Sequence, residues 1–387
     1  MSRVPSRLLD LLEYHSTAQR ILGEPQEDLG IAQIEPFPFL AIVGQTEMKL
    51  ALILALINPQ VGGVLLVGAR GTAKTTAVRS LVDLLPLRRN SACPEGCTEE
   101  ILEREGMDAI CKECAQKVGY GEPLTVEERV RIFELPLNAR LDDVVGGINE
   151  RLALEQQRLR LERGLLAQAD GNVLYIDEVN LLEKDVSNAI LDAAAQGFYT
   201  VRRGPLSLEY RSRFMLVGSM NPAEGQLRPQ ILDRFGLKAV VRGLPNNEAR
   251  YSVYKRAISY RTDPALLSSA YADATMSLAE EINEASSRLV DITVSEEAKK
   301  MGLNLIHDLK IESNRAEITL FEAAKAYCAS DERWVVQPVD IEAVALISLR
   351  LRQSDSLQDF YKNREDEDKQ VLSLIEAHNS QNGPDSE

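Results

Sequence analysis

The sequence predicts an α/β fold in which a parallel sheet flanked by helices is followed by an all-helical domain. Short apolar runs at 64–67 and 173–176 are bounded by glycine or charged residues, as expected for strands buried on both faces of a parallel sheet. After Leu244-Pro245 the apolar residues recur instead with the 3.6-residue spacing of helices. The first pattern predicts the sheet, and the second predicts the helical domain.

Length and charge limit the class of protein. A chain of 387 residues is long enough for two domains, and its formal net charge of −15 argues against binding to a nucleic-acid backbone. The N-terminus carries acidic residues inside its apolar part, so it does not match a signal peptide. The apolar stretch 48–68 is split by Asn58-Pro59-Gln60 and by Gly62-Gly63, which leaves neither half long enough to cross a bilayer. We therefore expect a cytoplasmic protein, or one of an equivalent reducing compartment, with no nucleic-acid partner and no membrane span.

The segment 68–75 reads Gly-Ala-Arg-Gly-Thr-Ala-Lys-Thr and lies between a strand-like run and a predicted helix. It matches the phosphate-binding pattern G-x-x-x-x-G-K-[ST], except that Ala73 replaces the last glycine and must adopt a backbone angle that an alanine tolerates. In this pattern the backbone N–H groups favour phosphates, Lys74 reaches the β- and γ-phosphates, and the Thr75 hydroxyl binds Mg²⁺. A strand, turn and helix without a ligand is the alternative. We expect ATP to be bound by Gly68, Arg70, Gly71, Thr72, Ala73, Lys74, Thr75 and Thr76.

The run 173–176 ends in two carboxylates, Asp177 and Glu178. Because the carboxyl ends of parallel strands meet at one edge of a sheet, both carboxylates are expected beside the phosphates. Asp177 would then hold Mg²⁺, and Glu178 would orient or deprotonate the water that attacks the γ-phosphate. A third run, 214–218, is followed by Asn221, whose amide could reach the same water. A helix cap or turn residue is the alternative role for Asn221.

Four of the five cysteines form two close pairs, Cys93 with Cys97 and Cys111 with Cys114, thirteen residues apart. This is the spacing of a structural Zn²⁺ site, in which four thiolates surround the ion and compensate for a small core. Disulfides are a second interpretation and fit a reducing compartment poorly, and four reduced thiols are a third. Cys328 stands alone in an apolar helical stretch, so we expect it in the core.

These patterns divide the chain into four parts. We expect an N-terminal helical extension at 1–34, a nucleotide-binding α/β domain at 35–244, a helical lid domain at 245–378 and a disordered tail at 379–387. The Cys-rich stretch 93–114 is an insertion in the α/β domain. Within that domain, 131–169 is expected to be a hairpin or loop insertion followed by a helix, and 200–211 a hairpin with a basic tip. Helices of the lid are expected at 246–260, 276–288, 295–309, 314–330, 338–352 and 356–377.

The chain resembles an AAA+ ATPase, which is a class of P-loop NTPase. The resemblance lies in the order of the phosphate-binding loop, the acidic strand end, the asparagine and the helical lid. Three longer segments narrow the resemblance: FPFLAIVGQTEMKLALILALINPQVGGVLLVG, RGLLAQADGNVLYIDEVNLL and VGSMNPAEGQLRPQILDRFGL. They are similar, almost word for word, to the small ATPase (I) subunit of magnesium chelatase and to the ATPase part of cobalt chelatase-like proteins. The resemblance covers about residues 35–352.

The resemblance implies an assembly and the residues that serve it. In that family the ATPase forms a ring, usually a hexamer, with ATP at the interfaces between subunits. Lys74 and Thr75 would bind the phosphates and Mg²⁺, Asp177 and Glu178 would be the Walker B pair, and Asn221 would be the sensor.

Two arginines also match the family's motifs. Arg234, in the stretch ILDRFGL, would be the arginine finger that stabilises charge on a neighbour's γ-phosphate. Arg315 matches the sensor arginine of the lid domain. Each arginine could instead belong to a surface ion pair, which contributes little to stability.

The resemblance further implies an ATP hydrolase of the magnesium chelatase type, with ATP and Mg²⁺ as cofactors, in the biosynthesis of tetrapyrroles such as chlorophyll. No metal-dependent adhesion domain follows the helices, so a separate von Willebrand A-type AAA+ partner subunit and a large chelatase subunit that holds the tetrapyrrole are implied. Because His15, His307 and His378 are far apart in sequence, we do not expect this chain to insert the metal itself. Ala73 and the four cysteines look more like the cobalt chelatase-like branch, which leaves Mg²⁺ and Co²⁺ both open.

Two other functions would use some or all of these residues. A MoxR-like AAA+ chaperone that remodels a von Willebrand A-domain partner shares every catalytic residue, so only the partner separates it from a chelatase motor. A scaffold that binds nucleotide without hydrolysing it does not require Glu178 or Arg234, and the presence of both argues against it.

Overall fold

The computed structural model describes residues 35–91, 93, 96–147, 163–203, 206–225 and 227–352. The expected N-terminal extension at 1–34, the helix at 356–377 and the tail at 379–387 lie outside the described residues, as does most of the charged segment before residue 163.

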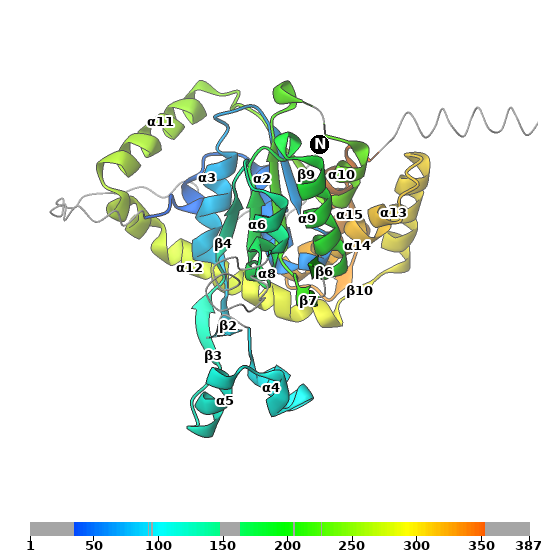
Figure 1. Cartoon of the computed structure of the whole chain (residues 1–387). Helices are drawn as coiled ribbons and strands as arrows, with labels where there is room; N and C mark the ends of the chain where they lie inside the picture. The colour runs from blue at the N-terminus through cyan, green and yellow to red at the C-terminus, as the bar shows by residue number, and fades with distance from the viewer. Residues whose placement is uncertain are drawn as a thin grey trace, which may run out of the picture.

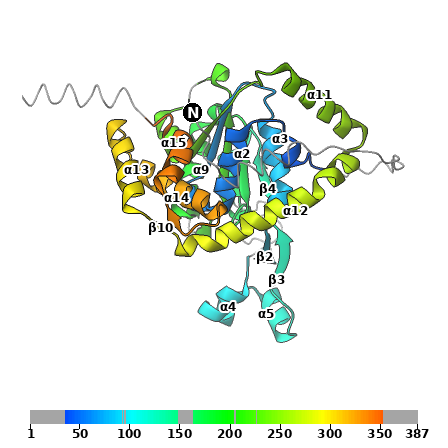
Figure 2. The ribbon, with the colours of Figure 1, turned by 180° about the vertical axis from the view of Figure 1, so that it is seen from behind.

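A five-stranded parallel sheet forms the centre of the molecule, with strand order β4-β5-β8-β1-β9. Its strands are β1 Val64–Gly68, β4 Ile132–Leu135, β5 Val173–Ile176, β8 Met215–Met220 and β9 Leu237–Val241. Figures 1 and 2 show helices on both faces, with α6 and α9 on one side and α2 with α12 and α14 on the other. The predicted fold class is therefore confirmed.

Two hydrophobic cores lie on opposite faces of this sheet. Val64 and Leu66 of β1 belong to one core, and Leu65 and Val67 to the other. Because successive side chains of a strand point to opposite faces, a strand covered on both sides is apolar at every position. This arrangement explains the uninterrupted apolar runs of the sequence.

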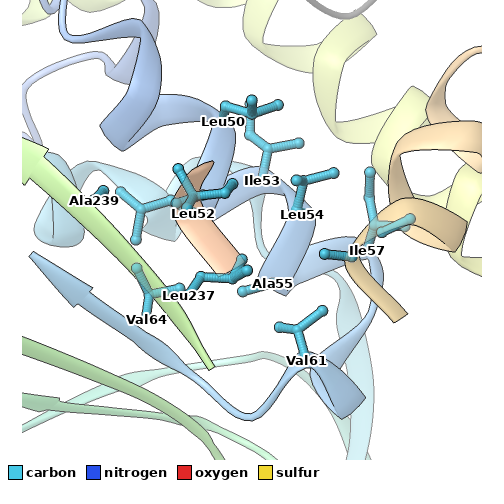
Figure 3. Close-up of a cluster of buried hydrophobic side chains, with 14 of the residues drawn as sticks. Leu50, Leu52, Ile53, Leu54, Ala55, Ile57, Val61, Val64, Leu237 and Ala239 are labelled. Atoms are coloured by element: carbon cyan, nitrogen blue, oxygen red, sulfur yellow. The ribbon is translucent and has the colours of Figure 1, made fainter. Parts of the chain in front are cut away.

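Helix α2 lies between the sheet and the helical domain. Figure 3 shows Leu52 and Ala55 on the side of α2 that faces Val64 and Leu237 of the sheet. Its other side packs against the helical domain, where α2 contacts α12 and α14. The α/β part thus contains α2 Thr46–Ile57, α3 Lys74–Arg79, α6 Leu141–Val145, α8 Leu165–Gln168, α9 Lys184–Gln196 and α10 Pro229–Arg234.

The prediction of a hairpin or loop near residue 131 is wrong. Residues Ile132–Leu135 form β4, which pairs in parallel with β5 at the edge of the central sheet. An edge strand of four residues that buries only Leu135 fully gives a weak sequence pattern, and Pro136 directly after it suggested a turn.

The cysteine-rich insertion is a small module on a two-stranded stalk. β2 Leu87–Ser91 pairs antiparallel with β3 Thr125–Arg129, and the chain between them carries α4 Glu99–Glu105 and α5 Lys112–Gly119. Figures 1 and 2 show this module projecting away from the rest of the molecule. Its buried residues form a third cluster, separate from both cores of the sheet.

The predicted hairpin at 200–211 is confirmed. β6 Phe198–Arg203 and β7 Leu206–Arg211 pair antiparallel directly after α9. In Figure 1 the hairpin lies at the same end of the sheet as α8.

The helical domain follows the sheet, as predicted. Its helices are α11 Asn247–Thr262, α12 Pro264–Arg288, α13 Glu296–Asp308, α14 Arg315–Ser330 and α15 Pro338–Leu349. Helix α12 begins at Pro264 rather than at 276, because Asp263 caps it by accepting the Leu266 N–H. A short parallel pair that the sequence did not predict, β10 Thr293–Val294 with β11 Val335–Val336, joins two of the connections between helices. Cys328 is fully buried in α14, as expected.

Within the described residues, none of the helices combines the length and the apolar character that crossing a bilayer requires.

Candidate nucleotide-binding site

The loop between β1 and α3 turns sharply at two residues with left-handed backbone angles. Gly71 has φ +76° and Ala73 has φ +67°. The loop thus needs Ala73 in the left-handed region, which alanine tolerates at a cost and glycine adopts freely. A non-glycine residue in that region costs on the order of 1–3 kcal/mol. The surrounding loop holds Ala73 at this angle. Glycine adopts the same angle without this cost, which explains why the usual motif has glycine at this position.

Lys74 lies inside the loop. Its ammonium donates to the carbonyl oxygens of Gly68 at 2.7 Å and Ala69 at 2.8 Å, and its side chain is mostly buried. Burial lowers the pKa of Lys74, while the carboxylates of Asp177 and Glu178 act in the opposite direction. The ammonium therefore lies where the predicted phosphates would bind.

The predicted magnesium ligands lie together. The Thr75 hydroxyl donates to Asp177 Oδ2 at 3.3 Å. The other carboxylate oxygen of Asp177 accepts from the Ser219 hydroxyl at 2.5 Å and from the Tyr175 hydroxyl at 2.9 Å. Burial raises the pKa of Tyr175 to about 12, so its hydroxyl remains a donor. Hydroxyl and carboxylate oxygens are a donor set that suits Mg²⁺.

Glu178 follows at the end of β5 in a left-handed conformation, with φ +54°. Its backbone N–H donates to the Ser219 hydroxyl at 3.1 Å, which anchors the turn to β8. Its side chain pairs with Arg70 of the P-loop, with the Arg70 Nη2 atom 3.1 Å from Glu178 Oε1. Glu178 therefore lies at the predicted edge of the sheet, beside the P-loop.

Asn221 is nearly buried at the end of β8. Its side-chain oxygen accepts the Ala223 N–H at 3.2 Å, which is the capping role considered as the alternative. Its amide nitrogen donates to Glu224 Oε1 at 2.6 Å, and the same oxygen lies 2.6 Å from Arg70 Nε. The structure thus joins Asn221 to the P-loop through Glu224.

Arg234 lies at the other end of the sheet. Leu237 pairs with Val64 at the start of β1, whereas the P-loop begins at Gly68, where β1 ends. The Arg234 carbonyl oxygen lies 4.0 Å from the position that a Cβ atom on Gly62 would take. Four strand residues at about 3.3 Å each separate the two ends by roughly 13 Å. Within one chain, Arg234 therefore does not reach the P-loop, and it pairs instead with Asp192 of α9 at 2.5 Å.

Arg315 lies near Arg234 and not near the P-loop. At the start of α14, its guanidinium is 3.7 Å from the carboxylate of Asp233. Asp233 also accepts from the Ser313 hydroxyl at 2.9 Å and from Arg352 at 3.0 Å. Asp233, which directly precedes Arg234, therefore connects α10 to the helical domain.

A cavity of about 1240 Å³ opens beside the P-loop. The loop contributes Gly71, Thr72 and Ala73 to its wall, and Thr75 and Thr76 follow at the start of α3. Its opposite wall includes Val253 and Tyr260 of α11. The cavity is large enough for a nucleotide, and its walls combine apolar and polar groups as ligand sites do.

The four cysteines of the insertion converge. The Sγ atoms of Cys93, Cys97, Cys111 and Cys114 all lie within 4.8 Å of one another. Two of the sulfurs accept backbone hydrogen bonds, from the Cys111 N–H to Cys97 at 3.3 Å and from the Cys114 N–H to Cys111 at 3.4 Å. None of the four forms a disulfide.

Known proteins resemble this chain along most of its length. A relative from Methanocaldococcus jannaschii, named magnesium-chelatase subunit ChlI homolog, is 40% identical over 81% of this chain and 84% of its own. The chain belongs to the magnesium-chelatase ChlI family. A ChlI subunit from Mesostigma viride is 36% identical over 88% of this chain and 95% of its own, and one from Synechocystis is 37% identical over 82% and 88%. The resemblance inferred from the sequence is confirmed.

Two family models match parts of the chain, and two solved structures are similar to it. The model described as magnesium chelatase, subunit ChlI, matches residues 150–234, and the model of the AAA lid domain matches 304–371. A crystal structure from Cytophaga hutchinsonii, 20% identical over 80% of this chain and 83% of its own with a TM-score of 0.50, has the same fold. A chain in a cryo-EM-based structure of the complex between subunits BchI and BchD of magnesium chelatase is 34% identical over 84% of this chain and 99% of its own, with a TM-score of 0.46.

Sequence reasoning missed three residues of the site in this ChlI-family chain. Ser219 and Tyr175 hold Asp177, and Glu224 joins Asn221 to Arg70. Tyr175 lies two residues before Asp177, and side chains two apart on a strand point to the same face, so its position in the sequence was a usable signal. Ser219 and Glu224 act across distances of about forty and 150 residues in sequence, which no local pattern reveals.

We expect the substitution Glu178→Gln to lower the ATPase kcat by roughly a hundredfold or more, because the amide cannot take a proton from the attacking water. Nucleotide affinity, measured by calorimetry with ADP, should stay within about threefold, because Lys74 and the backbone N–H groups of the P-loop are unchanged. Glu183→Gln is the matched control, since Glu183 is exposed and its side chain caps nothing. An unchanged rate of phosphate release from the Glu178 variant would remove Glu178 from the catalytic residues.

Proposed function

We propose that this chain is the ATPase motor subunit of a metal chelatase complex. It would hydrolyse ATP in a ring and drive insertion of Mg²⁺, with Co²⁺ as the second candidate, into a tetrapyrrole held by a partner subunit. One observation carries the proposal: Lys74, Thr75, Asp177 and Glu178 converge at one edge of the sheet in a chain whose relatives are named magnesium-chelatase subunits.

The residues divide the work of phosphoryl transfer to water. Lys74 would contact the β- and γ-phosphates, while Thr75 and Asp177 would hold the metal ion of Mg-ATP. The ion, when bound, neutralises charge on these phosphates. Glu178 would orient the water and accept its proton, and Asn221 would fix the position of the same water. Ser219 and Tyr175 keep the Asp177 carboxylate in place.

The position of Arg234 supports assembly into a ring. Arg234 is separated from its own P-loop by the length of β1, so a role at the γ-phosphate requires a second copy of the chain. Contacts of this head-to-tail kind close into a ring when the rotation between copies is right. We infer a homo-oligomeric ring, a hexamer by family resemblance, in which Arg234 and Arg315 act on the ATP of the neighbouring subunit.

We further propose the partners that the resemblance implied, a von Willebrand A-type AAA+ subunit and a large subunit that binds the tetrapyrrole. The relatives are named as subunits, which supports a complex of several chains. These names also favour the chelatase motor over a MoxR-like chaperone. None of the five cysteines, all of them described, forms a disulfide, which supports a reducing compartment such as the cytoplasm.

The proposed complex is tested by pull-down of the tagged chain with Mg-ATP, followed by an assay of metal insertion. We expect a large subunit to be recovered, and the mixture to insert Mg²⁺ or Co²⁺, assayed separately, into a porphyrin-type substrate only when ATP is present. Recovery of an adhesion-domain protein alone, without insertion of either metal, would favour the chaperone instead. A wild-type chain that binds ATP and does not hydrolyse it would refute both motors.

The shared site predicts complementation between variants. Arg234→Ala should bind nucleotide and assemble but lose roughly a thousandfold in turnover, as expected for a missing arginine finger. Mixing it with Lys74→Ala should restore part of the activity, because the second variant supplies the finger to intact P-loops. The double variant Lys74→Ala/Arg234→Ala supplies no finger and serves as the control. If Lys74→Ala and the double variant restore phosphate release equally when each is mixed with Arg234→Ala, the site is not shared between subunits.

We also propose that the four cysteines of the insertion hold a structural Zn²⁺ ion. The converging sulfurs, the two N–H bonds to sulfur and the small size of the third core support this cofactor. Disulfides and reduced thiols without metal are the competing states.

Metal analysis separates these three states. Protein purified without chelators should contain about one zinc per chain. The substitution Cys114→Ser should abolish the zinc and make the module sensitive to protease, because the ion would replace most of its core. Cys328→Ala, which removes a thiol from α14, should leave the zinc content unchanged. Protein that is free of zinc, with all five thiols titratable or with disulfides present, would refute the metal site.

A further inference from the structure

The Arg70 side chain is not directed into the phosphate-binding loop to which it belongs. Its guanidinium lies between two carboxylates, with Nη2 at 3.1 Å from Glu178 Oε1 and Nε at 2.6 Å from Glu224 Oε1. Arg70 itself is largely exposed, whereas the side chains of Glu178 and Glu224 are only 18% and 22% exposed. An exposed ion pair of this kind adds little to stability, so its significance lies in what it positions.

Glu224 connects this pair to the predicted sensor. The oxygen that meets Arg70 also accepts from the Asn221 amide at 2.6 Å. The hydrogen bond from Asn221 and the charge of Arg70 lower the pKa of Glu224, which keeps the carboxylate ionised. Its second oxygen, Oε2, is buried and has no hydrogen-bond partner among the described residues. One carboxylate therefore fixes both a cation of the P-loop and the amide at the end of β8.

Charge at this edge of the sheet is unevenly distributed. Asp177, Glu178 and Glu224 are three carboxylates beside the loop, and Lys74 is engaged with carbonyl oxygens of the loop. Arg70 is the cation that contacts Glu178, the residue that must be free to accept a proton from water. A γ-phosphate bound to this loop brings further negative charge and competes with both glutamates for Arg70.

We propose that Glu224 is a positioning residue of the ATPase site, which holds Arg70 against Glu178 until a γ-phosphate draws Arg70 away, and which keeps Asn221 oriented throughout. The inference rests on the proposed ATPase function and adds its regulation by the nucleotide. ADP lacks the γ-phosphate and leaves Arg70 on the carboxylates. ATP releases Glu178, so hydrolysis is coupled to recognition of the triphosphate.

Two substitutions of Glu224 separate its two contacts. Glu224→Gln removes the charge that holds Arg70 but keeps an oxygen that can accept from Asn221. Affinity for the Mg²⁺ complex of the ATP analogue AMP-PNP, relative to affinity for Mg-ADP, should rise roughly two- to fivefold, because Arg70 then gives up a weaker contact when it moves to the γ-phosphate. The kcat of this variant should fall, but less than that of Glu224→Ala, because the contact with Asn221 is kept. Glu224→Ala removes both contacts, so it should show the same shift in affinity and lose roughly ten- to a hundredfold in kcat.

The same substitutions at Glu284 are the matched controls, because Glu284 forms an exposed ion pair with Arg288 at 2.8 Å in α12, remote from the cavity. They should change neither quantity. In an Arg70→Gln background, Glu224→Gln should no longer alter the ratio of affinities, since the cation it holds is absent.

The outcomes distinguish this inference from the proposed function. If the wild type hydrolyses ATP and both Glu224 variants leave kcat and the affinity ratio within twofold, the positioning role is refuted and the ATPase stands. If both variants weaken AMP-PNP and ADP equally, Glu224 is a structural residue and the inference fails. If the wild type does not hydrolyse ATP, the proposed function fails. The affinity ratio still tests the inference in that case. A ratio that is the same in Glu224→Gln as in the wild type would show that the contact between Arg70 and Glu224 does not sense the γ-phosphate.

Discussion

The position of β8 between β1 and β5 is the constraint on which the site depends. The P-loop follows β1 and the acidic pair follows β5, so the two are not neighbours in the sheet. β8 fills the space between them, and Ser219 at its end bonds to both the Asp177 carboxylate and the Glu178 backbone. Because all three strands are parallel, their carboxyl ends coincide and the three loops meet. The strand order therefore brings the predicted catalytic residues to one edge of the sheet.

How much the sequence could predict depends on the distance over which each residue acts. The P-loop, Asp177 and Glu178 are contiguous with apolar strands, so short motifs located them. The position of Asn221 followed in the same way from the end of a strand. Glu224 could not be predicted, because its role arises from contact with Arg70, which is far away in the chain. The edge strand β4 was not predicted, because only Leu135 of its four residues is fully buried and so short a strand carries little periodicity.

The two arginines illustrate a different limit. Motif position suggested a catalytic role for Arg234 and Arg315, and the fold places both beside Asp233, away from the P-loop of their own chain. A motif carries no information about which copy of a chain completes a site. The register between β1 and β9 supplies this information, because it places Arg234 near the start of β1 and the P-loop at its end. A single chain is thus chemically incomplete if these arginines are catalytic.

The stalk of the cysteine module starts at the wall of the cavity. β3 ends at Arg129, and the residues 128–132 that continue from it line the space beside the P-loop. Five paired residues on each strand form a ribbon with α4 and α5 at its far end (Figure 1), and the four sulfurs cluster in this module. The ribbon therefore connects the cavity wall with the sulfur cluster. If it turned about its base at the cavity, the displacement of the cluster would grow with the length of the ribbon.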